Sequence, residues 1–190
     1  PLRYEETGSG LERNDVKITG PLLALDRQSG ELLWEFSESD GYPIESGIAV
    51  SGDTVVVAES HNESGSSNPG PDGGNIYGVD IESGDKLWKV SFDGRPEDEI
   101  AIYDDIAYVA ATHYNSGLNL SGEMSSSDYN QIIAVNIKNG QVIWELTDKD
   151  VFSIYAEKKA ISEQLNPAAD SSGVYLTTGS DSLVRITHNG

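Results

Sequence analysis

The chain has 190 residues, with 32 acidic and 12 basic side chains, a formal net charge of −20 and no cysteine. Such a charge repels polyanions and argues against nucleic acid as a partner, while the missing thiols exclude disulfides, thiol nucleophiles and Cys-ligated zinc. No apolar run has the length of a transmembrane helix, so we predict no membrane insertion. The acidity fits adaptation to high salt or the polar surface of an exported protein, and composition leaves both open.

The first predicted strands are short and polar. Residues 1–7 and 15–19 read as strands on either side of a polar turn, and an apolar hairpin follows over residues 22–36. We therefore expect a first four-stranded unit over residues 1–37.

The second unit contains the strongest β-forming run in the chain. Residues 54–58, TVVVA, are too apolar and β-branched for anything but a buried strand. A Ser-Gly-Asp turn joins this strand to a predicted one at residues 48–50, and a second hairpin follows over residues 76–90. These elements predict a unit over residues 47–92.

The same plan occurs twice more. Two strands joined by an Asp-Asp turn, at residues 100–103 and 106–111, precede a third hairpin over residues 132–146, which gives a unit over residues 99–147. A fourth unit, over residues 167–190, has three predicted strands and no fourth.

The three hairpins are copies of one pattern. They read LLALDRQSGELLWEF, IYGVDIESGDKLWKV and IIAVNIKNGQVIWEL, and their glycines are 54 and 56 residues apart (84−30 and 140−84). A repeat of about 50 residues built from strands and turns is typical of a β-propeller, because one hairpin cannot bury its own apolar face. The shared positions are Asp26, Gly30, Trp34, Asp80, Gly84, Trp88, Asn136, Gly140 and Trp144.

The pattern A-x-D-x-x-x-G-x-x-x-W resembles the tryptophan-docking repeat of the pyrroloquinoline-quinone-type, or quinoprotein alcohol dehydrogenase-like, β-propellers. The resemblance implies an all-β fold, a propeller of four-stranded antiparallel blades, here about four, with the tryptophans as structural residues between blades. Two arrangements stay open: a four-bladed ring closed by the N-terminal strand, or a fragment of a seven- or eight-bladed ring. We expect the second, in which the remaining blades or self-association cover the open strand edges.

Three connections are longer than a simple blade requires. They cover residues 59–74, 112–130 and 148–170, and the third has helical apolar spacing over residues 153–165. Repeat geometry places all three on one face, and extra loops gathered on one face of a repeat protein usually form its binding face.

This looped face carries carboxylates, imidazoles and phenols. Acidic oxygens suit a hard cation, but the spacing matches no calcium loop, so we predict no metal site. Two histidines at equivalent repeat positions form either a transition-metal pair or two solvated loop residues, and we expect the latter. The candidate binding residues are His61, Asp72, His113, Tyr114, Glu123, Asp128 and Tyr129.

Two functions remain. We predict a non-enzymatic exported scaffold, periplasmic, cell-surface or secreted, that binds a protein, peptide or glycan. The alternative is a segment of an alcohol or sugar dehydrogenase, for which the resemblance implies pyrroloquinoline quinone and calcium on the ring axis. Alcohol-oxidising relatives carry an adjacent-cysteine disulfide over the quinone, and this chain has no cysteine. No position matches the calcium ligands or the catalytic aspartate, so we predict no catalytic or cofactor-binding residue.

Overall fold

The computed structural model describes residues 3–5, 17–38, 44, 46–61, 73–113, 129–147, 165–178 and 182–190. In this part of the chain the regular structure is all β, and it holds no helix long and apolar enough to cross a bilayer. The strands are β1 (Arg3–Glu5), β2 (Lys17–Thr19), β3 (Leu22–Leu25), β4 (Leu32–Phe36), β5 (Ala49–Ser51), β6 (Thr54–His61), β7 (Gly73–Asp80), β8 (Lys86–Asp93), β9 (Arg95–Tyr103), β10 (Ile106–His113), β11 (Tyr129–Asn136), β12 (Val142–Thr147), β13 (Ala168–Asp170), β14 (Gly173–Thr178) and β15 (Ser182–Ile186).

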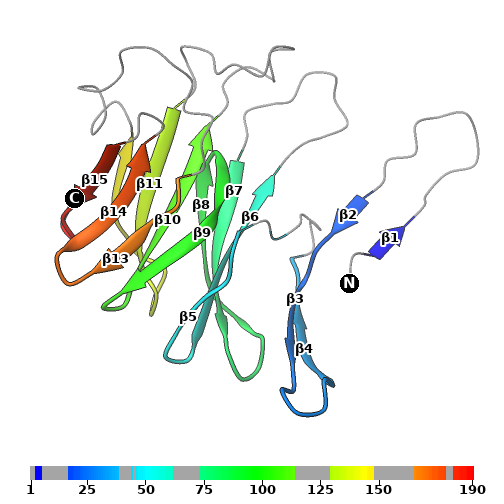
Figure 1. The fold of residues 1–190 in the computed structure, drawn as a ribbon. Helices are drawn as coiled ribbons and strands as arrows, with labels where there is room; N and C mark the ends of the chain where they lie inside the picture. The colour runs from blue at the N-terminus through cyan, green and yellow to red at the C-terminus, as the bar shows by residue number, and fades with distance from the viewer. Residues whose placement is uncertain are drawn as a thin grey trace, which may run out of the picture.

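The sheets are blades of one repeating plan. Two have four antiparallel strands, in the orders β5-β6-β7-β8 and β9-β10-β11-β12, and we call them blades two and three. The β3–β4 hairpin (blade one) and the three-stranded sheet β13-β14-β15 (blade four) lie on either side of them (Figure 1). The predicted all-β propeller architecture of four-stranded antiparallel blades is confirmed.

The first unit differs from the predicted four-stranded sheet. Strands β1 and β2 pair with each other, with Arg3 opposite Thr19, and form a two-stranded sheet separate from β3–β4. Only Gly20 and Pro21 separate β2 from β3. In the described residues no ladder joins β2 to β3, so the chain passes from one sheet into the other.

The predicted loop boundaries were also wrong, because the strands run further. Glu59 and His61 belong to β6 and pair with Asn75 and Gly73, and the β10–β11 ladder likewise continues to His113 opposite Tyr129. The polar side chains find partners inside the sheet, so the ladder does not stop where the apolar run stops. The predicted helix lies outside the described residues except for Leu165, which is buried in a non-helical segment.

The core consists of apolar layers between consecutive blades. Side chains of β6 alternate between two such layers, because successive strand residues point to opposite faces. Val57 packs toward Leu22 and Phe36 of blade one, whereas Val56 packs toward Val109 of blade three. A strand with a blade on each side needs apolar residues at every position, which explains the unbroken TVVVA run.

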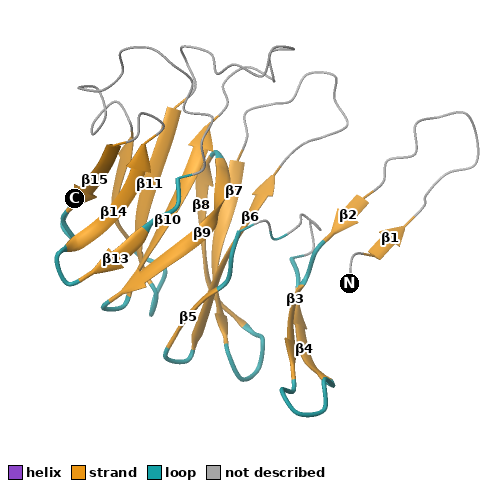
Figure 2. Cartoon of the chain, viewed as in Figure 1, coloured by secondary structure: helices purple, strands orange, loops and turns teal. Residues whose placement is uncertain are grey.

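The tight turns of the repeat gather at one end of the sheets, which we call the turn end (Figure 2). At the turn between β7 and β8, the Asp80 carboxylate accepts hydrogen bonds from the backbone N–H groups of Glu82 and Ser83, at 3.0 and 2.8 Å. Gly84 closes the turn with φ of 77°, a conformation that favours glycine. Its N–H donates to the Asp80 carbonyl at 2.9 Å.

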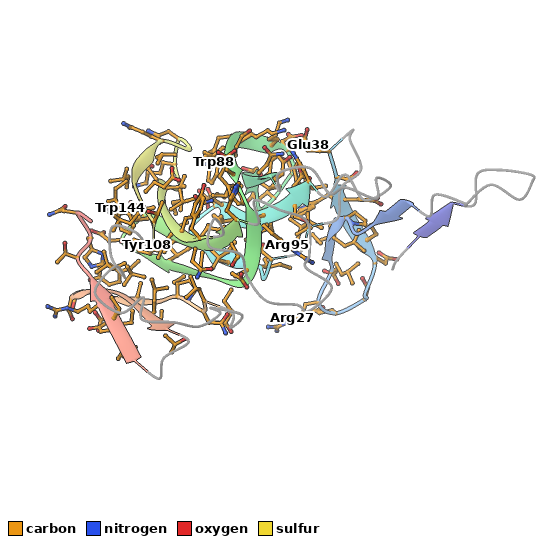
Figure 3. The ribbon with its side chains drawn as sticks, turned by 90° about the horizontal axis from the view of Figure 1, so that it is seen from above. Arg27, Glu38, Trp88, Arg95, Tyr108 and Trp144 are labelled. Carbon is orange, nitrogen blue, oxygen red and sulfur yellow. The ribbon has the colours of Figure 1, made fainter. Side chains whose placement is uncertain are left out.

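Each tryptophan docks on the turn of the next blade. The indole Nε1–H of Trp88 donates to the carbonyl of Ile137 at 2.6 Å, and that of Trp34 donates to Ile81 at 3.0 Å. The ring also covers the turn glycine: a Cβ added to Gly140 would lie 2.9 Å from Trp88. Trp144 repeats the contact on blade four, donating to His188 at 2.7 Å, and Figure 3 shows Trp88 and Trp144 on neighbouring blades.

The docking geometry predicts that a Trp→Phe substitution costs more stability at Trp88 than at Trp34. Trp88→Phe removes a buried hydrogen bond and part of a ring that is only 8 % exposed, so we expect a loss of about 1–3 kcal/mol of unfolding free energy. Trp34→Phe should lose less, because Trp34 is only half-buried. Urea unfolding followed by circular dichroism measures both, and equal losses at the two sites would contradict the grading.

The turn aspartates predict acid sensitivity. Hydrogen bonds from the following backbone N–H groups and from Ser29, Ser83 or Ser172 lower the pKa of Asp26, Asp80 and Asp170 below 3.8. The unfolded chain therefore binds these protons more tightly, and their stabilisation is lost as the pH falls through 3.8 toward the folded values. In urea midpoints measured from pH 6 to pH 2, Asp80→Asn should show a shallower decline than the parent, and an identical decline would refute this assignment.

Candidate functional site

Buried polar side chains gather at the end of the sheets opposite the turns, where β6 and β10 end and β7 and β11 begin. We call this the loop end. Thr54, at the turn end, is the one buried polar residue of the described chain that lies elsewhere. A concentration of buried polar groups at one end of a β core requires a hydrogen-bond network to hold it. The loop-end layer consists of Glu59, Ser60, Asn75, Thr112, His113, Asn130 and Gln131.

Glu59 is the centre of the layer in blade two. Its side chain is 2 % exposed, and its Oε1 accepts hydrogen bonds from Asn75 Nδ2 at 2.7 Å and from the Tyr77 hydroxyl. His61 Nε2 lies 3.0 Å from the same oxygen. A carboxylate buried this deeply is tolerated only when donors surround it, and here β6 and β7 supply them from facing positions.

Tyr77 links the Glu59 carboxylate to the interface between blades one and two. Burial, and then the hydrogen bond to Glu59, raise the pKa of the Tyr77 hydroxyl well above its usual value of 10. Its ring meets Phe36 edge-on at 5.4 Å, and Lys89 lies over it at 5.6 Å from the centroid. The phenol is therefore held as a neutral donor at physiological pH.

The Tyr77–Glu59 bond predicts an effect at neutral pH. Tyr77→Phe removes a donor from a buried carboxylate, and we expect a loss of about 1–3 kcal/mol of unfolding free energy at pH 7. Tyr175→Phe is the matched control, because its hydroxyl bonds the exposed Ser172 at 3.3 Å.

The same pair predicts alkaline sensitivity. The raised pKa means that the folded state holds the phenol proton more tightly, so this contribution is lost as the pH rises above 10. The parent should therefore lose stability more steeply than Tyr77→Phe in urea midpoints measured between pH 8 and pH 11. Parallel curves would contradict the buried donor.

Blade three holds a different arrangement at the equivalent place. The oxygen of the Thr112 hydroxyl lies 2.5 Å from Glu97 Oε1 and 2.8 Å from Asn130 Oδ1. Because the hydroxyl has one proton, it donates to only one of these two acceptors at a time. Gln131 Nε2 donates to the carbonyl of Asp93, which ties β11 to the last residue of β8. The Thr112–Glu97 contact ties this loop end to β9, an edge strand of blade three.

His113 Nδ1 and Gln131 Oε1 of blade three are buried without a hydrogen-bond partner among the described residues. The His113 ring stacks on Tyr129 with centroids 4.6 Å apart, and its side chain lies opposite Tyr129 in the ladder. Gln131 pairs with Ala111 in the same ladder. It is two residues from Tyr129, so the two side chains point to the same face of the sheet. A water or a polar group of a ligand would satisfy both atoms.

The structure describes three of the seven candidate binding residues. His61, His113 and Tyr129 are strand residues at the loop end. The two histidines are therefore not the solvated loop residues that we predicted, and His113 is only 8 % exposed. Each histidine has its own partner, Glu59 or Tyr129, so neither depends on a histidine pair. The other four, Asp72, Tyr114, Glu123 and Asp128, lie outside the described residues.

Sequence analysis missed Glu59, Asn75, Tyr77 and Gln131. A signal for them was available, because extending the hairpin register outward from the turn puts Glu59 opposite Asn75. Taking the end of the apolar run as the end of the strand concealed it.

The described residues do not fit a quinone and calcium centre. In this part of the chain no three histidine, aspartate or glutamate side chains are grouped to hold an ion. Glu59 already accepts bonds from Asn75 and Tyr77. We therefore derive no chemical step through calcium or quinone.

Fold and repeat together define the class: a β-propeller of tryptophan-docked, pyrroloquinoline-quinone-type blades. Residues 19–190 match the sequence model of the family described as outer membrane protein assembly factor BamB. The match covers most of the chain, so the chain belongs to this family.

A solved structure supports the fold, and a second is similar in part. A quinohemoprotein alcohol dehydrogenase from Pseudomonas putida HK5 is similar, with 16 % identity, a TM-score of 0.56, and 92 % of this chain and 31 % of that chain covered. BamB from Moraxella catarrhalis matches with 15 % identity, a TM-score of 0.34, and 92 % and 55 % coverage. A search of curated proteins finds no significant match. The chain thus spans about a third to about half the length of these two structures.

Proposed function

We propose that this chain is a non-enzymatic β-propeller module that binds a protein partner at its loop end, in an extracytoplasmic compartment. The observation that carries the proposal is family membership over residues 19–190, because the family's description names an assembly factor of the outer membrane. An assembly factor acts by contacting other proteins, and a periplasmic or outer-membrane setting follows from the same description.

The geometry supports the loop end as the contact surface. The bonds to Glu59 join β6 to β7, and the Gln131–Asp93 bond joins blade three to the end of β8 in blade two. The segments that leave His61 and His113 therefore start from fixed positions. A recognition surface built on rigid strand ends loses little conformational entropy on binding.

The net charge of the protein supports a basic surface as the partner. With a formal charge of −20, the protein attracts basic protein or peptide surfaces and repels anionic ones. We therefore place a basic protein surface ahead of a glycan, and we expect association to weaken as salt is raised.

The alternative, a segment of a pyrroloquinoline-quinone- and calcium-dependent dehydrogenase, is tested directly. Titration of the purified protein with the quinone and calcium, followed by visible absorbance and dye-linked alcohol or glucose oxidation, should show neither stoichiometric uptake nor turnover. Uptake with turnover would replace the binding module with the enzyme.

If the partner binds at the loop end, replacing a loop there should reduce binding. Replacing residues 115–127 by a Gly/Ser segment of equal length keeps β10 and β11 intact and should reduce recovery of the partner about tenfold or more. Recovery is measured by cross-linking in the cell envelope, co-purification and mass spectrometry, with Glu31→Ala at the turn end as control. A large fall in melting temperature with binding intact would contradict the proposal.

A further inference from the structure

The turn of blade three differs from the equivalent turns of blades one and two in the residue before its glycine. Blades one and two have Ser29 and Ser83 there, whereas blade three has Asn139. The side chains make the same contact: Asn139 Oδ1 accepts from the N–H of Gln141 at 2.9 Å, and Ser83 Oγ accepts from that of Asp85 at 3.2 Å. The turn conformation therefore does not require an asparagine.

The glycine that follows Asn139, by contrast, is required by the fold. Gly140 has φ of 71°, and a Cβ added to it would lie 2.9 Å from the Trp88 ring. An asparagine before glycine is the sequence most prone to deamidation, because a residue without a side chain lets its backbone nitrogen approach the carboxamide carbon closely. The fold thus places a labile pair of residues beneath a tryptophan of the neighbouring blade.

Deamidation of this pair needs only water. The Gly140 nitrogen loses its proton and attacks Cγ of Asn139, a C–N bond forms, and the side-chain nitrogen leaves as ammonia. Water then opens the succinimide ring at one of its two carbonyl groups and gives aspartate or isoaspartate. No oxidant, reductant or enzyme takes part in either step.

The folded turn holds the attacking nitrogen away from this reaction. The Gly140 N–H donates to the Asn136 carbonyl at 2.9 Å. The indole N–H of Trp88 donates to the Ile137 carbonyl at 2.6 Å, and its ring covers the turn. Attack on Asn139 therefore requires the turn to open, and because Trp88 belongs to blade two, opening requires the two blades to separate locally.

We propose that Asn139 is a site of spontaneous deamidation that the docked Trp88 protects, so that the reaction proceeds only when blades two and three separate. Isoaspartate runs the main chain through the former side chain, which lengthens the turn by one atom and moves the Gly140 N–H out of register with Asn136. Modified molecules therefore keep the dock open. The proposal rests on the contacts of the fold and is independent of the partner proposed for the loop end.

A second Asn-Gly pair in the sequence supplies a matched control. Asn189 and Gly190 lie in the turn of blade four, where a Cβ added to Gly190 would lie 3.4 Å from the Trp144 ring. Trp88→Phe removes a buried hydrogen bond from one dock, and we expect deamidation at Asn139 to rise about tenfold while Asn189 keeps its rate. Trp144→Phe should have the opposite effect.

Deamidation is followed in the full polypeptide during incubation at neutral pH. Peptide mass spectrometry and labelling by an isoaspartate methyltransferase locate the product, and the same polypeptide unfolded in urea sets the unprotected rate. Because opening is fast compared with deamidation, the rate reports the open population, and we expect Asn139 in the native parent to react at least about tenfold more slowly than in urea. Equal rates in the native and unfolded parent would overturn the proposal. So would an equal rise at both asparagines in Trp88→Phe, or no rise at Asn139.

Asn139→Ser gives a second readout with the dock left intact. Ser29 and Ser83 show that the turn accepts serine, so the fresh variant should melt at the temperature of the parent. After an incubation that converts Asn139, the parent should show a second, lower melting transition that the variant lacks. Identical melting of the aged parent and the aged variant would contradict a dock that stays open.

Discussion

The contact on which the fold depends is the indole of one blade resting on the turn of the next. The indole N–H satisfies a turn carbonyl, and the ring covers a glycine whose positive φ leaves no room for a side chain. The contact couples two blades that share no backbone hydrogen-bond ladder, so it fixes their relative position. Its repetition at Trp34, Trp88 and Trp144 makes the array regular.

The two ends of the blades are consequently different. At the turn end, Asp80 and its equivalents are solvated and hold short turns with backbone hydrogen bonds. At the loop end, Glu59 and Gln131 are buried and hold the strand ends with side-chain hydrogen bonds. Substitutions at the loop end therefore act on stability.

The acidic surface sets the conditions under which the molecule associates. Mutual repulsion keeps such chains apart at low salt, and the same field attracts basic groups and repels anionic ones. Blade one adds an apolar face to this surface, where Leu25 and Leu33 are exposed.

The sequence by itself determined the repeat, the all-β class, the positions of the hairpins and their tight turns. Turn and strand preferences are local, and a period of about 50 residues is visible without knowing what touches what. It did not determine that Glu59 and Asn75 are buried strand residues, because burial of a carboxylate depends on donors brought by another strand. Nor did it show that Trp34 packs on Gly84 whereas no described residue lies within 4 Å of a Cβ at Gly30, since both glycines occupy the same motif. Tertiary structure decides such questions because they concern contacts between blades, which no single repeat encodes.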